Sequence, residues 1–265
     1  MKTALVVFFV LCAMTCSRTA MAYRPFDATD AAVADVGEFE LEFGPAGYLA
    51  ETGDRFLVMP AMVLNLGVGR GWEVVLEGKR FLSIHDRSDE HRAQLLDTGL
   101  SLKGVLREGI LQDKEGPSVA TEFGLLLPTI YGEAGVGAIG AGILSQRGSM
   151  GIVHVNGALS LTRAQRVNLF AGTILEGPPH GSVRPVAEFW AAREFGTGSE
   201  VSGLLGAIWQ VRKNLSLDIG VRRAREDHLQ VVEVRAGLTW AARLWDVERS
   251  AISTRSLDRE SPGRS

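Results

Sequence analysis

The sequence has almost no cysteine. Only Cys12 and Cys16 occur among its 265 residues, and both lie in the apolar leader. A chain that loses this leader has no disulfide, so its stability must come from another source, such as a large closed sheet. Aromatic residues make up only 7% of the chain, and the net charge is −3. Since no basic run with interleaved aromatic residues occurs, we expect no nucleic-acid partner.

Beyond its first residues the sequence also lacks an apolar run long enough for a membrane-spanning helix. Its start has the three parts of a secretory signal. These are a basic n-region with Lys2, the apolar run Ala4–Met14 and the small-x-small cleavage sequence Ala20–Ala22. We predict a signal peptide over residues 1–22, cleaved before Tyr23. The apolar run is too short for a membrane anchor. A lipoprotein site at Cys16 is the alternative.

Residue patterns for chemistry are scarce as well. The five histidines have no spacing typical of a zinc site, and we expect no metal and no cofactor. The run Gly135–Gly140 matches a dinucleotide fingerprint, but it lacks the preceding strand and following helix that would aim amides at a pyrophosphate. His154 and Asn156 share a predicted strand face, as His and Ser do in some barrel phospholipases. Since no nucleophile is evident beside them, we predict that the protein is not an enzyme.

What the sequence does contain is an alternation of apolar and charged residues with a period of two. In Gly37–Phe43 large apolar residues alternate strictly with Glu38, Glu40 and Glu42. Successive side chains of a strand point to opposite faces, so one face here is apolar and the other acidic. Glycine is frequent, with 31 residues, which we interpret as tight turns and close strand packing.

Twelve segments with this character follow one another at even spacing. They are Glu38–Tyr48, Phe56–Val68, Trp72–Ile84, Ala93–Arg107, Val119–Leu127, Val136–Gln146, Met150–Thr162, Val167–Glu176, Val183–Glu194, Glu200–Gln210, Leu215–Arg223 and Gln230–Trp240. Strands of about ten residues joined by turns predict an all-β fold, a twelve-stranded antiparallel up-and-down transmembrane β-barrel. Pro60 should interrupt strand pairing with a bulge or an unpaired position.

These segments divide the chain into a signal peptide (1–22), a periplasmic arm (23–37), a barrel (38–245) and a disordered polar tail (246–265). Both the N-terminal and the C-terminal end of the chain should be periplasmic. We expect the turns Gly69–Gly71 and Arg147–Ser149 on that side and three other loops outside. Those loops are His85–Arg92, Pro128–Gly135 and Ala224–His228.

Alternation does not say which face is inside. Twelve strands enclose more space than side chains fill in small barrels, and the strand length matches a bilayer, so we expect lipid outside and a polar lumen. A soluble periplasmic barrel or a sandwich is the alternative. Tryptophans near strand ends (Trp72, Trp209, Trp240 and Trp245) predict interfacial belts, whereas Trp190 should lie in the lumen.

The polar faces of these strands give the predicted lumen lining. Its residues are Glu40, Glu42, Glu73, Glu77, Lys79, Asp97, Lys103, Arg107, Glu122, His154, Asn156, Arg184, Glu188, Asp218, Arg222, Glu233 and Arg235. Such charges either filter solutes in a hydrated channel or form a paired network that keeps the lumen closed. If the first and last strands close the barrel, we expect Glu233 and Arg235 beside the acidic stripe Glu38–Glu42.

Several segments resemble Gram-negative outer-membrane proteins grouped as transporters of the meta-pathway of phenol degradation. They are Gly37–Glu42, Leu126–Thr129, Leu204–Ala207, Asn214–Val221 and Gly237–Trp240. The resemblance covers most of the exported chain and implies a twelve-stranded outer-membrane barrel for uptake or efflux of small solutes, aromatic ones among them. Such barrels usually end at an aromatic residue that guides assembly, whereas residues 246–265 follow Trp245 here.

From this resemblance we expect an outer-membrane location and four kinds of partner. These are outer-membrane lipid, the barrel assembly machinery, periplasmic chaperones and a small-molecule solute. The function expected is passage of solutes without chemistry. A non-conducting structural or lipid-binding barrel is the alternative.

Overall fold

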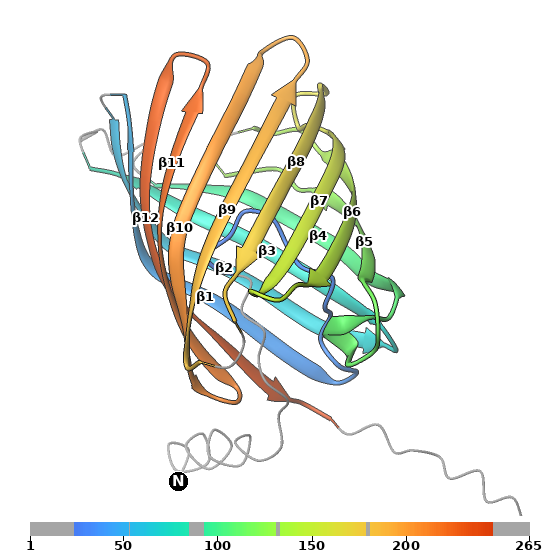
Figure 1. Ribbon diagram of the computed structural model, residues 1–265. Helices are drawn as coiled ribbons and strands as arrows, with labels where there is room; N and C mark the ends of the chain where they lie inside the picture. Colours follow the sequence, from blue (N-terminus) through green and yellow to red (C-terminus); the bar gives the residue numbers. More distant parts are fainter. Residues whose placement is uncertain (1–23, 53, 85–92, 131–132, 179–180, 246–265) are drawn as a thin grey trace, which may run out of the picture.

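In the part of the chain that the structure describes, twelve antiparallel strands form one closed barrel (Figure 1). This computed structural model describes residues 24–52, 54–84, 93–130, 133–178 and 181–245. The strands are β1 (Glu38–Glu51), β2 (Asp54–Gly69), β3 (Trp72–Ser83), β4 (Ala93–Arg107), β5 (Ser118–Leu126), β6 (Gly137–Arg147), β7 (Ile152–Leu161), β8 (Val167–Glu176), β9 (Val183–Glu194), β10 (Gly198–Arg212), β11 (Leu215–Glu226) and β12 (Leu229–Arg243). Each pairs with its neighbours in sequence, and β1 pairs with β12 to close the barrel. The predicted fold class is confirmed.

The strand ends lie within a few residues of those predicted, and the predicted bounds of β4, β8 and β9 are confirmed. The interruption at Pro60 is also confirmed, because the register of β2 against β3 shifts between Val58 and Ala61. A second shift lies between Phe43 and Ala46, on β1 where it faces β12. Pro60 lies at the first of these shifts and Pro45 at the second. Proline has no N–H to donate to a neighbouring strand, so it fits a position where the pairing is interrupted.

The outer face of the barrel is apolar and the inner face is polar. Leu205, Phe123 and Leu159 are 67%, 59% and 55% exposed on the outside, whereas Glu188 and His154 are fully buried inside. Water-soluble barrels keep their apolar side chains in the middle, and membrane barrels show the arrangement found here. No helix of the described residues is long and apolar enough to span a bilayer.

Both predicted short turns lie at the end of the barrel where β1 begins and β12 ends. The short 3-10 helix η1 (Ile110–Gln112), between β4 and β5, lies at the same end (Figure 1). The loop His85–Arg92 falls outside the described residues, as do the leader and the tail. The described residues 128–130 and 133–135 and the turn at 224–228 lie at the opposite end.

The four tryptophans expected in two belts lie at one end only. Trp72 begins β3, Trp209 and Trp240 lie near the ends of β10 and β12, and Trp245 follows β12. Because strand direction alternates around the barrel, these positions all fall on the side of the short turns. This side therefore carries a tryptophan girdle typical of a membrane interface.

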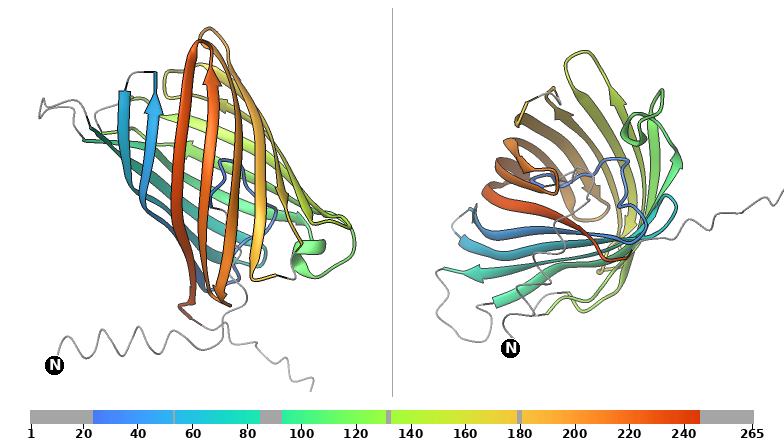
Figure 2. Two further views of the ribbon diagram at one scale, coloured as in Figure 1. Left: turned by 60° about the vertical axis from the view of Figure 1, so that its left-hand side comes forward. Right: turned by 90° about the horizontal axis from the view of Figure 1, so that it is seen from below.

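The sequence predicted an arm ahead of the barrel at residues 23–37, but residues 24–36 do not form one. They run through its interior, where the blue segment in Figure 2 crosses between opposite walls. Their contacts reach from β1 to β12, including Glu188 on β9 and Glu73 on β3. We call residues 24–36 the lumen segment.

Introducing an arginine on the outward face of β10 tests whether the outer face of the barrel meets lipid. Leu205→Arg, at the middle of the strand, should lower the free energy of unfolding by about 2–4 kcal/mol, because a charge at the bilayer midplane is costly. Val211→Arg is the control, since this residue faces the same way near the strand end and should cost about 0–1 kcal/mol. Urea unfolding in lipid vesicles measures both, and equal small costs would contradict a lipid-facing exterior.

Candidate functional site

The polar lumen is the candidate functional site, and the predicted lining positions fall into three groups by exposure. Most are buried, namely Glu42, Glu73, Lys103, His154, Asn156, Glu188, Asp218, Arg222, Glu233 and Arg235. Partly exposed positions are Glu40, Lys79, Glu122 and Arg184. Exposed positions are Glu77, Asp97 and Arg107. The third group lies beside a register shift in β3 or at the end of β4, where alternation no longer determines burial.

The lumen segment is held mainly by its backbone. The amides of Asp27 and Ala28 donate to the carboxylate of Glu188, the latter at 2.7 Å. The Asn156 side chain exchanges two hydrogen bonds with the backbone of Thr29, at 3.2 and 2.7 Å. Wall side chains thus take the place that a neighbouring strand would have, and satisfy buried backbone groups that have no ladder partner.

The same pattern continues toward the start of β1. The amide of Ala31 donates to the hydroxyl of Ser145 at 3.0 Å, and that of Ala34 to the carboxylate of Glu73 at 2.6 Å. Several separate wall strands therefore hold successive amides of one extended segment. The shortest of these amide hydrogen bonds go to Glu73 and Glu188, at 2.6 and 2.7 Å, so these two side chains are the main anchors of the backbone.

Glycines in the wall make room for the lumen segment. A Cβ at Gly67 would lie 1.9 Å from the backbone oxygen of Asp35, and one at Gly44 would lie 2.5 Å from the guanidinium of Arg24. A Cβ at Gly237 would come equally close to Arg24, at 2.3 Å. Larger residues at these positions would therefore push against the segment.

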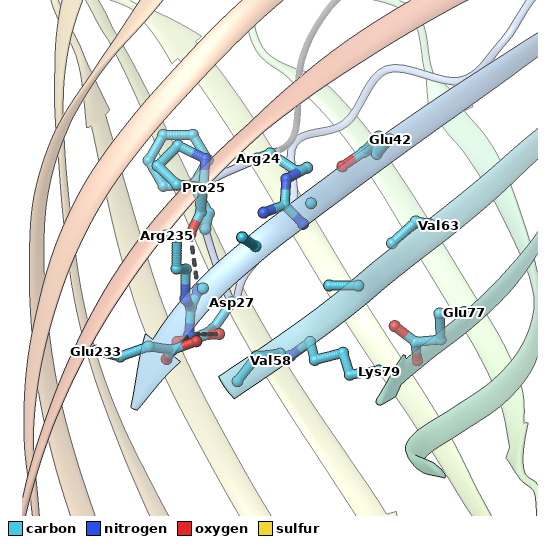
Figure 3. Close-up of a pocket in the computed structure, with 15 residues that line it drawn as sticks. Arg24, Pro25, Asp27, Glu42, Val58, Val63, Glu77, Lys79, Glu233 and Arg235 are labelled. Atoms are coloured by element: carbon cyan, nitrogen blue, oxygen red, sulfur yellow. Dashed lines mark hydrogen bonds and ion pairs between the residues drawn. The ribbon is translucent and has the colours of Figure 1, made fainter. Parts of the chain in front are cut away.

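Asp27 lies at the centre of the best-connected charge cluster (Figure 3). Its carboxylate is 2.7 Å from Nη2 of Arg235 and accepts a 3.1 Å hydrogen bond from the indole N–H of Trp190. Nε of Arg222 is 3.8 Å away. The expectation that Trp190 lies in the lumen is confirmed by these contacts.

The charges around Asp27 keep it ionised. Burial alone would raise the pKa of its carboxyl. The positive charge of Arg235, with those of Lys79 and Arg222, outweighs burial and lowers this pKa to about 2. A carboxylate is therefore present in the cluster throughout the physiological pH range.

Glu233 and Arg235 do not lie beside the acidic stripe of β1, contrary to expectation. Closure of β1 on β12 places Glu42 opposite Thr239, and it places Leu49 opposite Glu233. The strands are antiparallel, so the start of β12 meets the end of β1. Glu233 instead accepts hydrogen bonds from Arg235 at 2.7 Å and from Arg222 at 3.0 Å.

Lys103 forms a second charge cluster on the other side of the lumen. Its ammonium group is 3.5 Å from Glu73 and 3.9 Å from Asp30, and donates to the Thr29 hydroxyl at 3.3 Å. The side chain is only 2% exposed. An ammonium so deeply buried needs these partners, and Asp30 and Thr29 belong to the lumen segment.

His154 has neighbours that sequence analysis missed. Ser145 lies 2.8 Å from its Nδ1, and Glu176 lies 3.5 Å from its Nε2. The set has the composition of a catalytic triad, but Ser145 is fully buried and its oxygen accepts the amide of Ala31. The serine hydroxyl thus holds the backbone of the lumen segment. Pairing of Ser145 with His154 across the β6–β7 hairpin was the signal that could have identified it.

A cavity of about 110 Å³ remains between the lumen segment and the wall. Figure 3 shows Arg24, Asp27 and Arg235 on one side of it and Glu77 and Lys79 on the other. Groups of both signs border the cavity, so it can hold water or a small polar molecule.

Comparison with solved structures supports the fold. The KdgM porin in complex with disordered oligogalacturonate is 10% identical, with a TM-score of 0.50 over 76% of this chain and 98% of that one. The NanC porin is 7% identical, with a TM-score of 0.54 over the same shares of the two chains. No family model and no curated protein sequence matches the chain. The resemblance to meta-pathway transporters therefore stays a prediction, and what the likeness to these porins shows is the fold, a transmembrane β-barrel.

Proposed function

We propose that the protein is an outer-membrane channel that passes small solutes and performs no chemistry. One observation carries this proposal: the lumen is wide enough to hold a winding polypeptide of thirteen residues, 24–36, with its side chains. A bore that admits a peptide also admits a small solute when the peptide is displaced. Wall charges of both signs would then line a hydrated path.

The lumen segment acts as the gate in this proposal. It obstructs the bore, but it belongs to none of the strands of the wall. Its anchors are hydrogen bonds from backbone amides to side chains such as Glu188 and Ser145, together with the ion pairs of Asp27 and Asp30. Water can replace these bonds, so the segment can leave without breaking the barrel. The solutes would be small, and the family resemblance suggests that aromatic or hydrophobic ones are included.

A non-conducting barrel is the rival function, and one observation favours it. Lys103 is 2% exposed and is close to Asp30 of the lumen segment as well as to Glu73 of the wall. Removing the segment would take one of the carboxylates away from a buried cation, which is costly. In this alternative the segment is a permanent part of the core, and the barrel has a structural or lipid-binding role.

Deletion of residues 24–34 separates the two functions. The deletion leaves the predicted leader, Tyr23 and the turn before β1 in place. We expect larger and longer-lived current steps than in the intact protein, because the peptide no longer occupies the bore. Single-channel recording in planar bilayers measures this, with heat-modifiable gel migration showing that the barrel has folded. A folded deletion variant without current at any voltage would contradict the channel.

A glycine substitution tests the gate within the full-length chain. Gly67→Ala should cost the docked segment about 1–3 kcal/mol, because the new methyl group overlaps the backbone of Asp35 and Ala34. That cost raises the undocked fraction by roughly fivefold to a hundredfold. Gly157→Ala on β7 is the matched control, since a Cβ there meets no atom within 4 Å. Open probability in planar bilayers should rise for Gly67→Ala alone, and equal open probabilities would refute gating by the segment.

A further inference from the structure

The environment of the Asp27 carboxylate consists of hydrogen-bond donors from the wall. Arg235 contributes a guanidinium nitrogen at 2.7 Å from one oxygen, and Trp190 contributes its indole N–H at 3.1 Å from the other. Neither group can accept a hydrogen bond. A hydroxyl or an amide nitrogen would satisfy this site less well than two carboxylate oxygens do.

Both arginines of this site have carboxylate partners in the wall. Glu233 accepts from Arg235 at 2.7 Å and from Arg222 at 3.0 Å, and Glu200 accepts from Arg222 at 3.1 Å. All of these residues lie on the wall strands β10 to β12. If the lumen segment leaves, these wall contacts remain. The indole N–H then loses its acceptor, and Arg235 loses both Asp27 and the Pro25 carbonyl, to which its Nη1 donates at 2.7 Å.

An aromatic surface adjoins the same position. The rings of Phe170 and Trp190 lie with their centroids 5.6 Å apart, and the guanidinium of Arg222 lies 5.8 Å from the centre of the Trp190 ring. The ring of an aromatic carboxylate bound at this position would lie next to the Phe170–Trp190 ring pair and the guanidinium of Arg222, both of which favour contact with a ring.

We infer that Arg235, Trp190 and Arg222 form a binding site for a small aromatic carboxylate, and that Asp27 of the lumen segment occupies this site as a tethered substitute. The inference rests on the proposed channel function, for which it names a substrate class. The tether gives Asp27 a high effective concentration at the site. A solute carboxylate that competes with Asp27 also loosens the segment, so solute binding and gate opening are coupled.

Calorimetric titration of the detergent-solubilised protein with benzoate tests the site without requiring conduction. We expect Asp27→Asn to bind benzoate at least tenfold more tightly than the wild type, because the competing charge is gone. Asp30→Asn is the matched control, since it removes the segment's other buried aspartate, near Lys103, and leaves Asp27 in place. Because Asp30 pairs with Lys103, this change also loosens the segment, and its benzoate affinity should rise by a smaller factor than that of Asp27→Asn. Benzamide, the neutral analogue, should not bind.

Two further changes in the Asp27→Asn background identify the wall groups. Arg235→Gln should weaken benzoate binding roughly tenfold to a hundredfold, as expected for loss of a hydrogen bond from a charged donor. Trp190→Phe removes the indole N–H and keeps a ring, so it serves as the second probe if Arg235→Gln does not fold. It should weaken benzoate binding by a smaller factor.

Equal affinities of benzoate and benzamide, or equal benzoate affinities of the wild type and Asp27→Asn, would overturn the inference. These outcomes differ from failure of the channel itself. A protein that binds benzoate but passes no current after deletion of residues 24–34 keeps the carboxylate site and loses the proposed function. A protein that conducts but does not distinguish the two ligands keeps the function and loses the site.

Discussion

Charged side chains line the inside of a barrel whose outside is apolar, and each buried charge needs a partner. Part of that requirement is met within the wall, where Glu233 bridges Arg222 and Arg235. The rest is met by the lumen segment, whose Asp27 and Asp30 lie beside Arg235 and Lys103. The segment and the lumen charges therefore depend on each other. Without the segment, the same charges would require water.

This dependence explains why an obstructed lumen is compatible with a channel. Water in an open bore and amides of the segment are alternative partners for the same carboxylates and hydroxyls. Glu188 illustrates this, because it accepts two successive amides of the segment and would accept water equally well. Exchange of one set of partners for the other leaves the ladder hydrogen bonds of the barrel in place. A polar lumen suits a segment that has to exchange with solvent.

Much of the fold could be predicted from the sequence. The period of two identified every strand, and Pro60 correctly indicated an irregular pairing. The sequence predicted less well how deeply each lumen side chain is buried and at which end of the barrel a residue lies. Alternation assigns Glu77 and Asp97 to the polar face, but it does not say that they are more exposed than Lys103. The four end tryptophans were correctly placed near strand ends, yet only strand direction brings them to a single girdle.

The sequence by itself determined the strands, their two faces and the antiparallel order, because these follow from local periodicity and short turns. Only the tertiary structure decided where residues 24–36 lie and which wall groups they meet. The amide of Ala28 and the carboxylate of Glu188 are 160 positions apart. A hydrogen bond from a backbone amide to such a distant side chain produces no periodic pattern in the sequence of either segment. Closure of the barrel brings such distant groups together, and the carboxylate site around Asp27 exists only as a result of that closure.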